Sequence, residues 1–306
     1  MAETRSSEEL QELLREVRHI RVQSGRLVRG ALAGGYRSVF RGTGIEFEEV
    51  REYVEGDDPR SVDWNVTARM GRPFIKKFVD ERQLNLAFLF DLSASMDAGF
   101  HAWTPRQMAA RVCACLMLAA VKFDDRVAFL GFDEKVRCFE PPRKGMSHVL
   151  RIVRDFLELP SAPQQADPAV AMDYAARNLP AHSAVFVVSD FLDPRWTTAL
   201  QDLAARHEVV AVRLRAPELE ELPAGMWRLR DAEGGGRRIV DGGDRGVREA
   251  YRRRVEEWDR ELRASLQRMH VAVMDVPIPK TADPDAVARP ILAFFQRRAG
   301  RGGSAG

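Results

Sequence analysis

Residues 86–95 read LAFLFDLSAS, and this stretch decides the fold that the sequence predicts. Its first five residues, Leu86–Phe90, are all apolar, which is typical of a strand buried on both faces of a sheet. Asp91 follows directly, and Ser93 and Ser95 come at every second position after it. In α/β folds ligands bind at the carboxyl ends of such strands, so this junction is also the first candidate for a functional site.

Other apolar runs along the chain have the same character. They are Val127–Phe132, Val185–Val188, Val209–Leu214 and Val271–Met274. Stretches with helical spacing separate them, and Thr104–Lys122 begins with the Thr-Pro pair that favours a helix start. Three Asp-Pro pairs predict further helix starts, at Asp167-Pro168, Asp193-Pro194 and Asp283-Pro284. Strands that alternate with helices predict an α/β fold with a doubly wound, mostly parallel sheet.

Two segments of this predicted domain depart from the alternation. The short run around Cys138 predicts an antiparallel strand at the edge of the sheet. Met226–Leu229 and Arg237–Val240, joined by a glycine-rich turn, predict a late β-hairpin insertion. A long amphipathic helix is expected after it, from about Asp244 to Arg268.

The sequence before the main domain has little continuous apolar character. We expect residues 1–82 to form an N-terminal helix, over about residues 7–28, and a small β-containing segment packed on the main domain. Its strands are predicted at Ile45–Val54 and Phe74–Val79. The main domain is placed at residues 83–299, and the glycine-rich residues 300–306 are expected to form a flexible tail.

Composition limits the classes of partner and compartment. The 47 basic and 45 acidic residues of this 306-residue chain give a net charge of +2, which offers no reason to expect a polyanionic partner such as nucleic acid. Arginines gather between Arg15 and Arg41, but an acidic block beginning at Glu46 follows them closely. No run of 18 apolar residues and no segment of signal-peptide type is present, so we expect a cytoplasmic protein without membrane insertion.

The residues after the first strand have the chemistry of a divalent-cation site. Asp91, Ser93 and Ser95 project to one side of an extended loop because they stand two residues apart. One carboxylate and two hydroxyls are hard oxygen ligands that suit Mg²⁺ or Mn²⁺. Asp190 follows the run Val185–Val188 and faces the same crevice if the two strands are neighbours. Alternatively, Asp91 caps the following turn, because Asp and Ser are common turn residues.

Several short motifs carry a resemblance to a known family. They are Arg51-Glu52-Tyr53, Gly56-Asp57-Asp58-Pro59-Arg60, Asp63-Trp64, Ala68-Arg69 and Asp91-x-Ser93-x-Ser95. From about Gly30 to Phe295 the chain resembles the bacterial family called domain of unknown function 58. The resemblance implies a von Willebrand factor A-like fold with a metal-ion-dependent adhesion site. It also implies a frequent pairing with MoxR-type AAA+ ATPases, in systems thought to act as chaperones or assembly factors.

The resemblance implies four metal ligands, Asp91, Ser93, Ser95 and Asp190. The threonine that usually completes the set is replaced by Ala166, which offers no side-chain oxygen. We therefore expect a weakened metal affinity, with water in the missing position, or a domain that binds without metal. Asp167 is better explained as the cap of the helix that begins at Pro168.

A second group of polar residues lies in the N-terminal segment. It comprises Asp57, Asp58, Arg60, Asp63 and Trp64. Exposed Trp and Arg side chains suit a partner surface. The alternative, which we favour, is an ion-paired loop that clamps the N-terminal segment onto the sheet.

These features favour a non-enzymatic protein-binding module that acts with a MoxR-type AAA+ ATPase in chaperone-like assembly or activation of other proteins. One alternative is a metal-free scaffold of the same fold, motivated by Ala166. Another is a metal-dependent phosphatase-like enzyme with Asp91 as nucleophile, which is disfavoured because Ser93 stands where such enzymes place a second acid. The chain has no P-loop and no H-x-x-x-H pair.

Overall fold

The computed structural model describes residues 46–54, 57, 62–79, 83–99, 101–160, 166–220, 222–230, 236–283 and 285–302. These residues fall into two compact units, one within Arg41–Leu84 and one that includes Asn85–Gly306. The expected N-terminal helix, over residues 7–28, lies outside the described residues. Each unit is considered by itself.

The larger unit is built on a six-stranded sheet. Its strands are β3 (Asn85–Asp91), β4 (Arg126–Phe132), β5 (Val136–Arg143), β6 (Ala184–Ser189), β7 (Glu208–Arg215) and β10 (Ala272–Pro277). Their order across the sheet is β10-β7-β6-β3-β4-β5, and only β5 is antiparallel to its neighbour. From β3 the chain first adds β4 and β5 on one side and then β6, β7 and β10 on the other. This change of direction is typical of a doubly wound sheet, so the predicted doubly wound, mostly parallel fold is confirmed. Cys138 lies in β5, so the antiparallel edge strand is confirmed as well.

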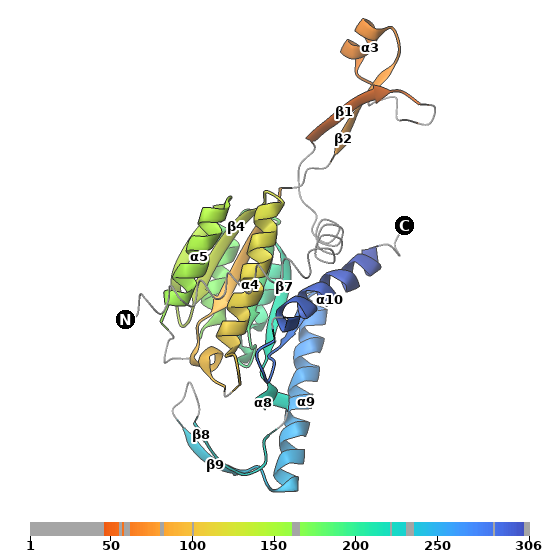
Figure 1. The fold of residues 1–306 in the computed structure, drawn as a ribbon. Helices are drawn as coiled ribbons and strands as arrows, with labels where there is room; N and C mark the ends of the chain where they lie inside the picture. The colour runs from red at the N-terminus through yellow and green to blue at the C-terminus, as the bar shows by residue number, and fades with distance from the viewer. Residues whose placement is uncertain are drawn as a thin grey trace. The chain divides into compact units, whose positions relative to one another are not determined.

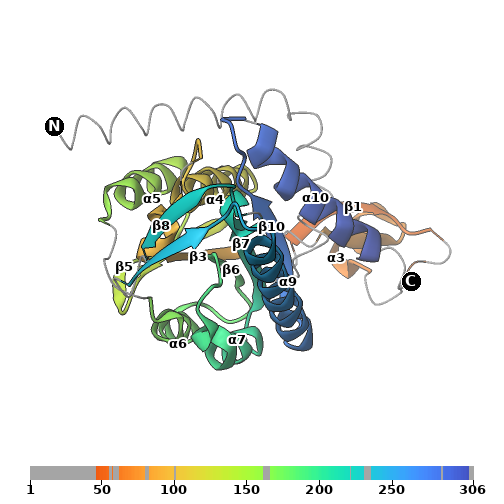
Figure 2. The same ribbon diagram turned by 90° about the horizontal axis from the view of Figure 1, so that it is seen from below.

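Helices cover both faces of this sheet (Figures 1 and 2). The long ones are α4 (Pro105–Lys122), α5 (Met146–Glu158), α6 (Pro168–Asn178), α7 (Thr197–Ala204), α9 (Arg245–Arg268) and α10 (Asp285–Gly302). In Figure 2, α4, α5 and α10 lie on one side of the strands and α6, α7 and α9 on the other. Because both faces are covered, Leu86–Phe90 is buried at every position, which explains its continuous apolar sequence.

The helix starts follow from capping side chains, as predicted. Thr104 and Gln107 form a capping box at the start of α4, and Pro105 occupies its first turn. Asp167 accepts a hydrogen bond from the Ala169 backbone N–H and caps α6. Asp193 caps a short 3₁₀ helix, η3 (Pro194–Trp196), which leads directly into α7.

A buried ion-pair network fastens α9 to the sheet. The Arg213 side chain in β7 is fully buried, and its Nε atom donates to Asp275 Oδ1 in β10 over 2.7 Å. Arg213 also pairs with Asp259 of α9. Arg263 contacts both carboxylates, with 2.9 Å to Asp259 Oδ2 and 2.7 Å to Asp275 Oδ2. Every charge in this network has an opposite partner, which a buried arginine requires.

The late hairpin is confirmed as β8 (Met226–Arg230) and β9 (Arg237–Asp241), an antiparallel pair. It is inserted between α8 (Pro217–Glu220) and α9. At its base the backbone of Gly242 passes so close to Pro223 that an added Cβ would lie 2.0 Å from the Pro223 carbonyl oxygen. Only glycine fits this approach.

The smaller unit contains two antiparallel strands and one short helix. β1 (Glu46–Glu52) pairs with β2 (Phe74–Val79), at the positions predicted for the N-terminal strands. Between them lies α3 (Trp64–Met70), which the sequence reading did not predict. Asp63 caps α3, and Gly71 ends it in the left-handed conformation that favours glycine.

Candidate metal-binding site

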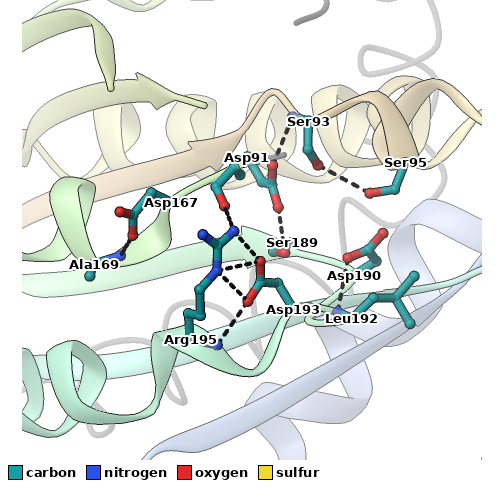
Figure 3. A network of polar contacts seen from close by, with 11 residues as sticks. Asp91, Ser93, Ser95, Asp167, Ala169, Ser189, Asp190, Leu192, Asp193 and Arg195 are labelled. Atoms are coloured by element: carbon teal, nitrogen blue, oxygen red, sulfur yellow. Dashed lines mark hydrogen bonds and ion pairs between the residues drawn. The ribbon is translucent and has the colours of Figure 1, made fainter. Parts of the chain in front are cut away.

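The candidate site lies where two neighbouring parallel strands end. β3 and β6 pair directly, with Phe90 opposite Val188, so the next residues along each strand are Asp91 and Ser189. Asp190 follows immediately. The sequence placed Asp91 and Asp190 in one crevice on the condition that their strands are neighbours, and β3 and β6 are neighbours. Figure 3 shows the side chains gathered at this edge of the sheet.

The loop after β3 is held by its own backbone and by Asp91. The Ser93 backbone N–H donates to Asp91 Oδ1 over 2.8 Å, and the Leu92 N–H donates to the Phe132 carbonyl over 2.8 Å. The Ser93 and Ser95 hydroxyl oxygens lie 3.0 Å apart. A 3₁₀ helix, η2 (Ala94–Asp97), then begins. Asp91 thus caps the turn that brings the two serine hydroxyls together. The capping role of Asp91 and the clustering of oxygen atoms are therefore compatible with each other.

The loop after β6 presents Asp190 from the other side. Asp190 Oδ1 accepts from the Leu192 backbone N–H over 3.1 Å, and the Ser95 hydroxyl also donates to this carboxylate. Phe191 has a φ of 58°, which is unusual for a residue with a large side chain, and its ring packs edge-on against Trp196 at 5.6 Å. Strained backbone of this kind is concentrated at functional sites.

Electrostatics at the site are dominated by two buried acids. Asp91 and Asp190 are each only 6% exposed. Burial, and then the negative charge of Asp190, raise the pKa of Asp91 to about 6. Burial likewise raises the pKa of Asp190. Among the described residues neither carboxylate forms an ion pair with a Lys, Arg or His side chain, so their repulsion is not neutralised within this part of the chain.

A small pocket opens beside these carboxylates. Asp91, Ser93, Ser189 and Asp190 form its polar side. The opposite side is apolar and is lined by Phe132, Ala166, Met172, Val187, Phe191 and Trp196. Ala166 therefore lies at the site, in the region where the family resemblance placed it, and it contributes a methyl group to the lining.

Arg195 and Asp193 form the border of the pocket next to Ala166. The Arg195 Nη2 atom donates to the Ala166 carbonyl oxygen over 2.6 Å, and its Nε atom donates to Asp193 Oδ2 over 2.9 Å (Figure 3). Partial burial acts to raise the pKa of Asp193, but the hydrogen bonds and the charge of Arg195 hold it below its usual value. Asp193 is thus neutralised by Arg195, in contrast to the two acids inside the pocket.

The donor set suits a hard divalent cation. Within the described ranges no three His, Cys, Asp or Glu side chains come together, and the pocket lining offers two buried carboxylates with serine hydroxyls and no imidazole or thiolate. Two carboxylates with serine hydroxyls are oxygen donors of the kind that Mg²⁺ and Mn²⁺ take, with water completing the shell. A cation there would also offset the repulsion between Asp91 and Asp190.

Sequence reasoning missed two contributors. The first is Ser189, for which the sequence predicted no role, yet its hydroxyl donates to Asp91 Oδ2 over 2.7 Å. The second is Arg195. The motif Asp193-Pro194-Arg195 gave a cap signal, and nothing in the sequence indicated that the arginine would reach Ala166.

The predicted partner surface lies in the smaller unit and is only partly described. Asp58 and Arg60 are outside the described residues. Asp57 pairs with Arg51 over 2.7 Å, and Asp63 is buried as the α3 cap, so both make local structural contacts. Trp64 is 74% exposed. Of this group, Trp64 is the described side chain best placed to meet a partner.

Comparisons with known proteins agree with the resemblance. The family model described as "Protein of unknown function DUF58" matches residues 49–261. An uncharacterized protein of Mycobacterium tuberculosis is 34% identical over 210 residues, which are 67% of this chain and 66% of the relative. The alignment thus spans just under two thirds of the length of that relative.

Solved structures that align with this chain include a conserved hypothetical protein from a bacterium and a VWA domain. The conserved hypothetical protein BatB from Bacteroides thetaiotaomicron aligns with a TM-score of 0.43 at 15% identity, over 71% of this chain and 99% of that one. The SpRpn10 VWA domain aligns with a TM-score of 0.38 at 10% identity, over 68% of this chain and 95% of that one. No helix among the described residues is both long and apolar enough to cross a membrane.

Proposed function

The chain belongs to the DUF58 family, and from this premise we propose that it is a non-catalytic protein-binding module of von Willebrand factor A-like fold, whose metal-ion-dependent adhesion-type site recognises an acidic side chain of a partner. The ion would be Mg²⁺ or Mn²⁺. The observation that carries the proposal is the pair of buried acids, Asp91 and Asp190, that no basic side chain neutralises among the described residues.

Each side chain has a distinct role in this proposal. Asp91 would bind the ion directly or through water, and Ser93 and Ser95 would supply hydroxyl ligands. Asp190 would bind through water or orient one. When bound, the ion supplies an electrophilic position that a partner carboxylate can fill. Ser189 holds Asp91 in place from the neighbouring strand.

We further propose that the partner is a MoxR-type AAA+ ATPase and that the pair acts in chaperone-like assembly or activation of other proteins. The support is the family resemblance of the chain. The chain itself has no P-loop, so a partner would have to supply nucleotide hydrolysis.

Calorimetric titration with Mg²⁺ and Mn²⁺ tests the metal proposal. We expect saturable binding that is lost in Asp91→Ala and in Ser93→Ala/Ser95→Ala. Asp167→Asn is the matched control, because Asp167 is a nearby carboxylate that caps α6 and does not line the pocket. Wild-type protein that shows no saturable binding to either ion would refute the metal role.

A pull-down with the cognate ATPase, in Mg²⁺ and in EDTA, tests the partner proposal. We expect recovery in Mg²⁺ and a loss of recovery in EDTA or with Asp91→Ala. Equal recovery under all these conditions would remove the metal from the mechanism while retaining the partner. Absence of recovery under every condition would refute the ATPase as partner.

One observation favours a second candidate, a metal-free scaffold of the same fold. Ala166 lies in the pocket lining and offers no side-chain oxygen, and its carbonyl oxygen already accepts from Arg195. Titrations separate the two candidates, because a scaffold would bind its partner with the same affinity in EDTA.

A further inference from the structure

The β8–β9 hairpin presents one face on which arginines and large apolar side chains lie together. Cross-strand pairs place Arg228 opposite Ile239 and Arg230 opposite Arg237. Met226 lies on the same face, two residues before Arg228. We call these five residues the ribbon face. All five are exposed, and Met226 and Ile239 are each 69% exposed.

The opposite face of the hairpin carries Trp227, Leu229, Arg238 and Val240. Trp227 and Val240 are half-buried, and the Trp227 indole N–H donates to the Pro223 carbonyl over 2.8 Å. Arg248 of α9 donates to the Gly243 carbonyl oxygen over 2.9 Å. The hairpin is therefore anchored at its base, and its half-buried side chains lie on the face opposite the ribbon face.

The arginines of the ribbon face form no ion pair in the part of the chain that the structure describes. One carboxylate, Asp241, lies on the same face, where it stands opposite Met226 and accepts from the Gly243 backbone N–H over 2.8 Å. Arg230 and Arg237 stand directly opposite each other, an arrangement that destabilises a strand pair. Charged side chains on a hairpin can prevent aggregation through its edges. Met226 and Ile239, exposed beside the arginines, have the opposite effect, because exposed apolar side chains favour association.

The hairpin also lies at the edge of the sheet that carries the candidate metal site. β7 runs parallel to β3 and β6, and the hairpin follows the carboxyl end of β7 (Figure 1). Asp91 and Asp190 mark the carboxyl ends of β3 and β6. The hairpin and the candidate metal site therefore lie at the same end of the sheet.

We propose that the ribbon face docks a protein partner whose surface has an apolar centre bordered by carboxylates. Met226 and Ile239 would pack on the apolar centre, and the arginines would pair with the surrounding carboxylates. Three arginines on a chain of net charge +2 are a weak match for a polyanion such as nucleic acid, whose binding depends on many phosphate contacts. This contact goes beyond the proposed metal site and does not require an ion.

Fluorescence anisotropy in EDTA tests the inference with a defined probe. The probe is a labelled 18-residue helical peptide with a leucine stripe bordered by glutamates, and the comparison probes are the same peptide with lysines for glutamates and a 20-base-pair DNA duplex. We expect saturable binding of the glutamate peptide to the full chain. Arg230→Glu/Arg237→Glu and Met226→Ser/Ile239→Ser should each weaken it by about tenfold or more.

The matched control is Arg126→Glu/Arg143→Glu, which makes the same charge change at two other exposed arginines. It should bind the glutamate peptide like wild type. Arg230→Gln/Arg237→Gln should weaken binding without introducing negative charge, and circular dichroism should show unchanged folding for all variants. Four outcomes would each overturn the inference. The glutamate peptide could fail to bind, or the lysine peptide could bind equally well. The DNA duplex could bind more tightly, or the ribbon-face variants could bind the glutamate peptide with wild-type affinity. None of these results bears on Mg²⁺ binding, which the titrations above measure separately.

Discussion

Ser189 donates its hydroxyl hydrogen to Asp91 across two neighbouring strands, with 2.7 Å between Ser189 Oγ and Asp91 Oδ2. A hydrogen bond to a carboxylate favours the charged form, so Ser189 opposes the effects of burial and of Asp190 on the pKa of Asp91. One side chain thus helps to keep the proposed metal ligand ionised, and it comes from the strand that carries the second acid.

Ser189→Ala should weaken Mg²⁺ binding and raise the pKa of Asp91 further, because it removes this hydrogen bond. The substitution also removes the bond that the Phe191 backbone N–H donates to Ser189 Oγ over 3.0 Å, so the loss of stability should be about 2 kcal/mol, typical for two buried hydrogen bonds. Calorimetric titration and urea unfolding measure the two effects. Ser183→Ala is the control, since Ser183 is also buried and donates to the Pro180 carbonyl over 2.5 Å, outside the pocket. Mg²⁺ affinities reduced equally by both substitutions would contradict a specific role for Ser189.

Asp91→Asn and Asp190→Asn should each stabilise the protein in EDTA, because each removes one charge of a repelling buried pair. In Mg²⁺ the wild-type protein should instead be more stable than the two variants. An ion at a hundred times its dissociation constant stabilises wild type by about 2.7 kcal/mol, and the variants lack this gain. Thermal melts in EDTA and in Mg²⁺ measure both effects. Variants less stable than wild type in EDTA would show that the pair does not repel.

The metal-free protein should lose stability as pH rises from about 4 to about 6. Asp91 has a pKa of about 6 in the folded protein and an ordinary pKa near 3.8, so between these values the folded state binds more protons than the unfolded state. The contribution of Asp91 to stability is therefore greatest below its ordinary pKa. Urea midpoints in EDTA across this range measure the slope. Asp91→Asn should flatten it, and an unchanged slope in that variant would assign the effect to other groups.

Ala166→Thr should tighten Mg²⁺ binding, because it places a hydroxyl in the lining of the pocket that holds Asp91 and Ser93. We expect a gain of about tenfold, which corresponds to about 1.4 kcal/mol. Ala166→Val is the matched control, since valine has nearly the same shape and no hydroxyl. A gain in both variants would point to packing and not to a new ligand, and a gain in neither would argue against an ion beside Ala166.

Phe88→Ala should destabilise the larger unit by about 3–5 kcal/mol, the range for a large aromatic side chain removed from a core. Phe88 is fully buried in β3, and its ring stacks on Phe186 of β6 at 5.0 Å. Guanidinium unfolding followed by circular dichroism measures the loss. Val170→Ala, at an exposed position of α6, should change stability by less than about 0.5 kcal/mol. A small effect of Phe88→Ala would mean that the β3–β6 contact contributes little to the core.

The strands, the main helix starts and the late hairpin could be predicted from the sequence because their causes are local. Leu86–Phe90 is apolar throughout because both faces of β3 are covered, and Thr104 and Asp167 cap helices through their own side chains. The helix α3 was missed because no apolar stripe marks it, and none of its residues is buried. Asp63 and Gly71 mark its ends, but without an apolar stripe between them the same residues are equally typical of turns.

The candidate site was half predictable. The spacing of Asp91, Ser93 and Ser95 placed three oxygens in one loop, since this depends only on the alternation of an extended chain. Whether Asp190 would join them depended on which strands are neighbours, and that depends on the packing of the whole sheet. The contacts of Ser189 with Asp91 and of Arg195 with Ala166 join residues 98 and 29 positions apart, so no local pattern indicated them.

By itself, the sequence determined the α/β architecture and the oxygen donors of the loop after β3, because hydrophobic periodicity and side-chain spacing are properties of neighbouring residues. Tertiary structure alone decided that two acids share one buried crevice, that Ala166 lines it, and that Met226 and Ile239 are left exposed beside arginines. The physical reason is that burial and charge proximity depend on the folded arrangement of distant segments, which strand order and helix packing establish together.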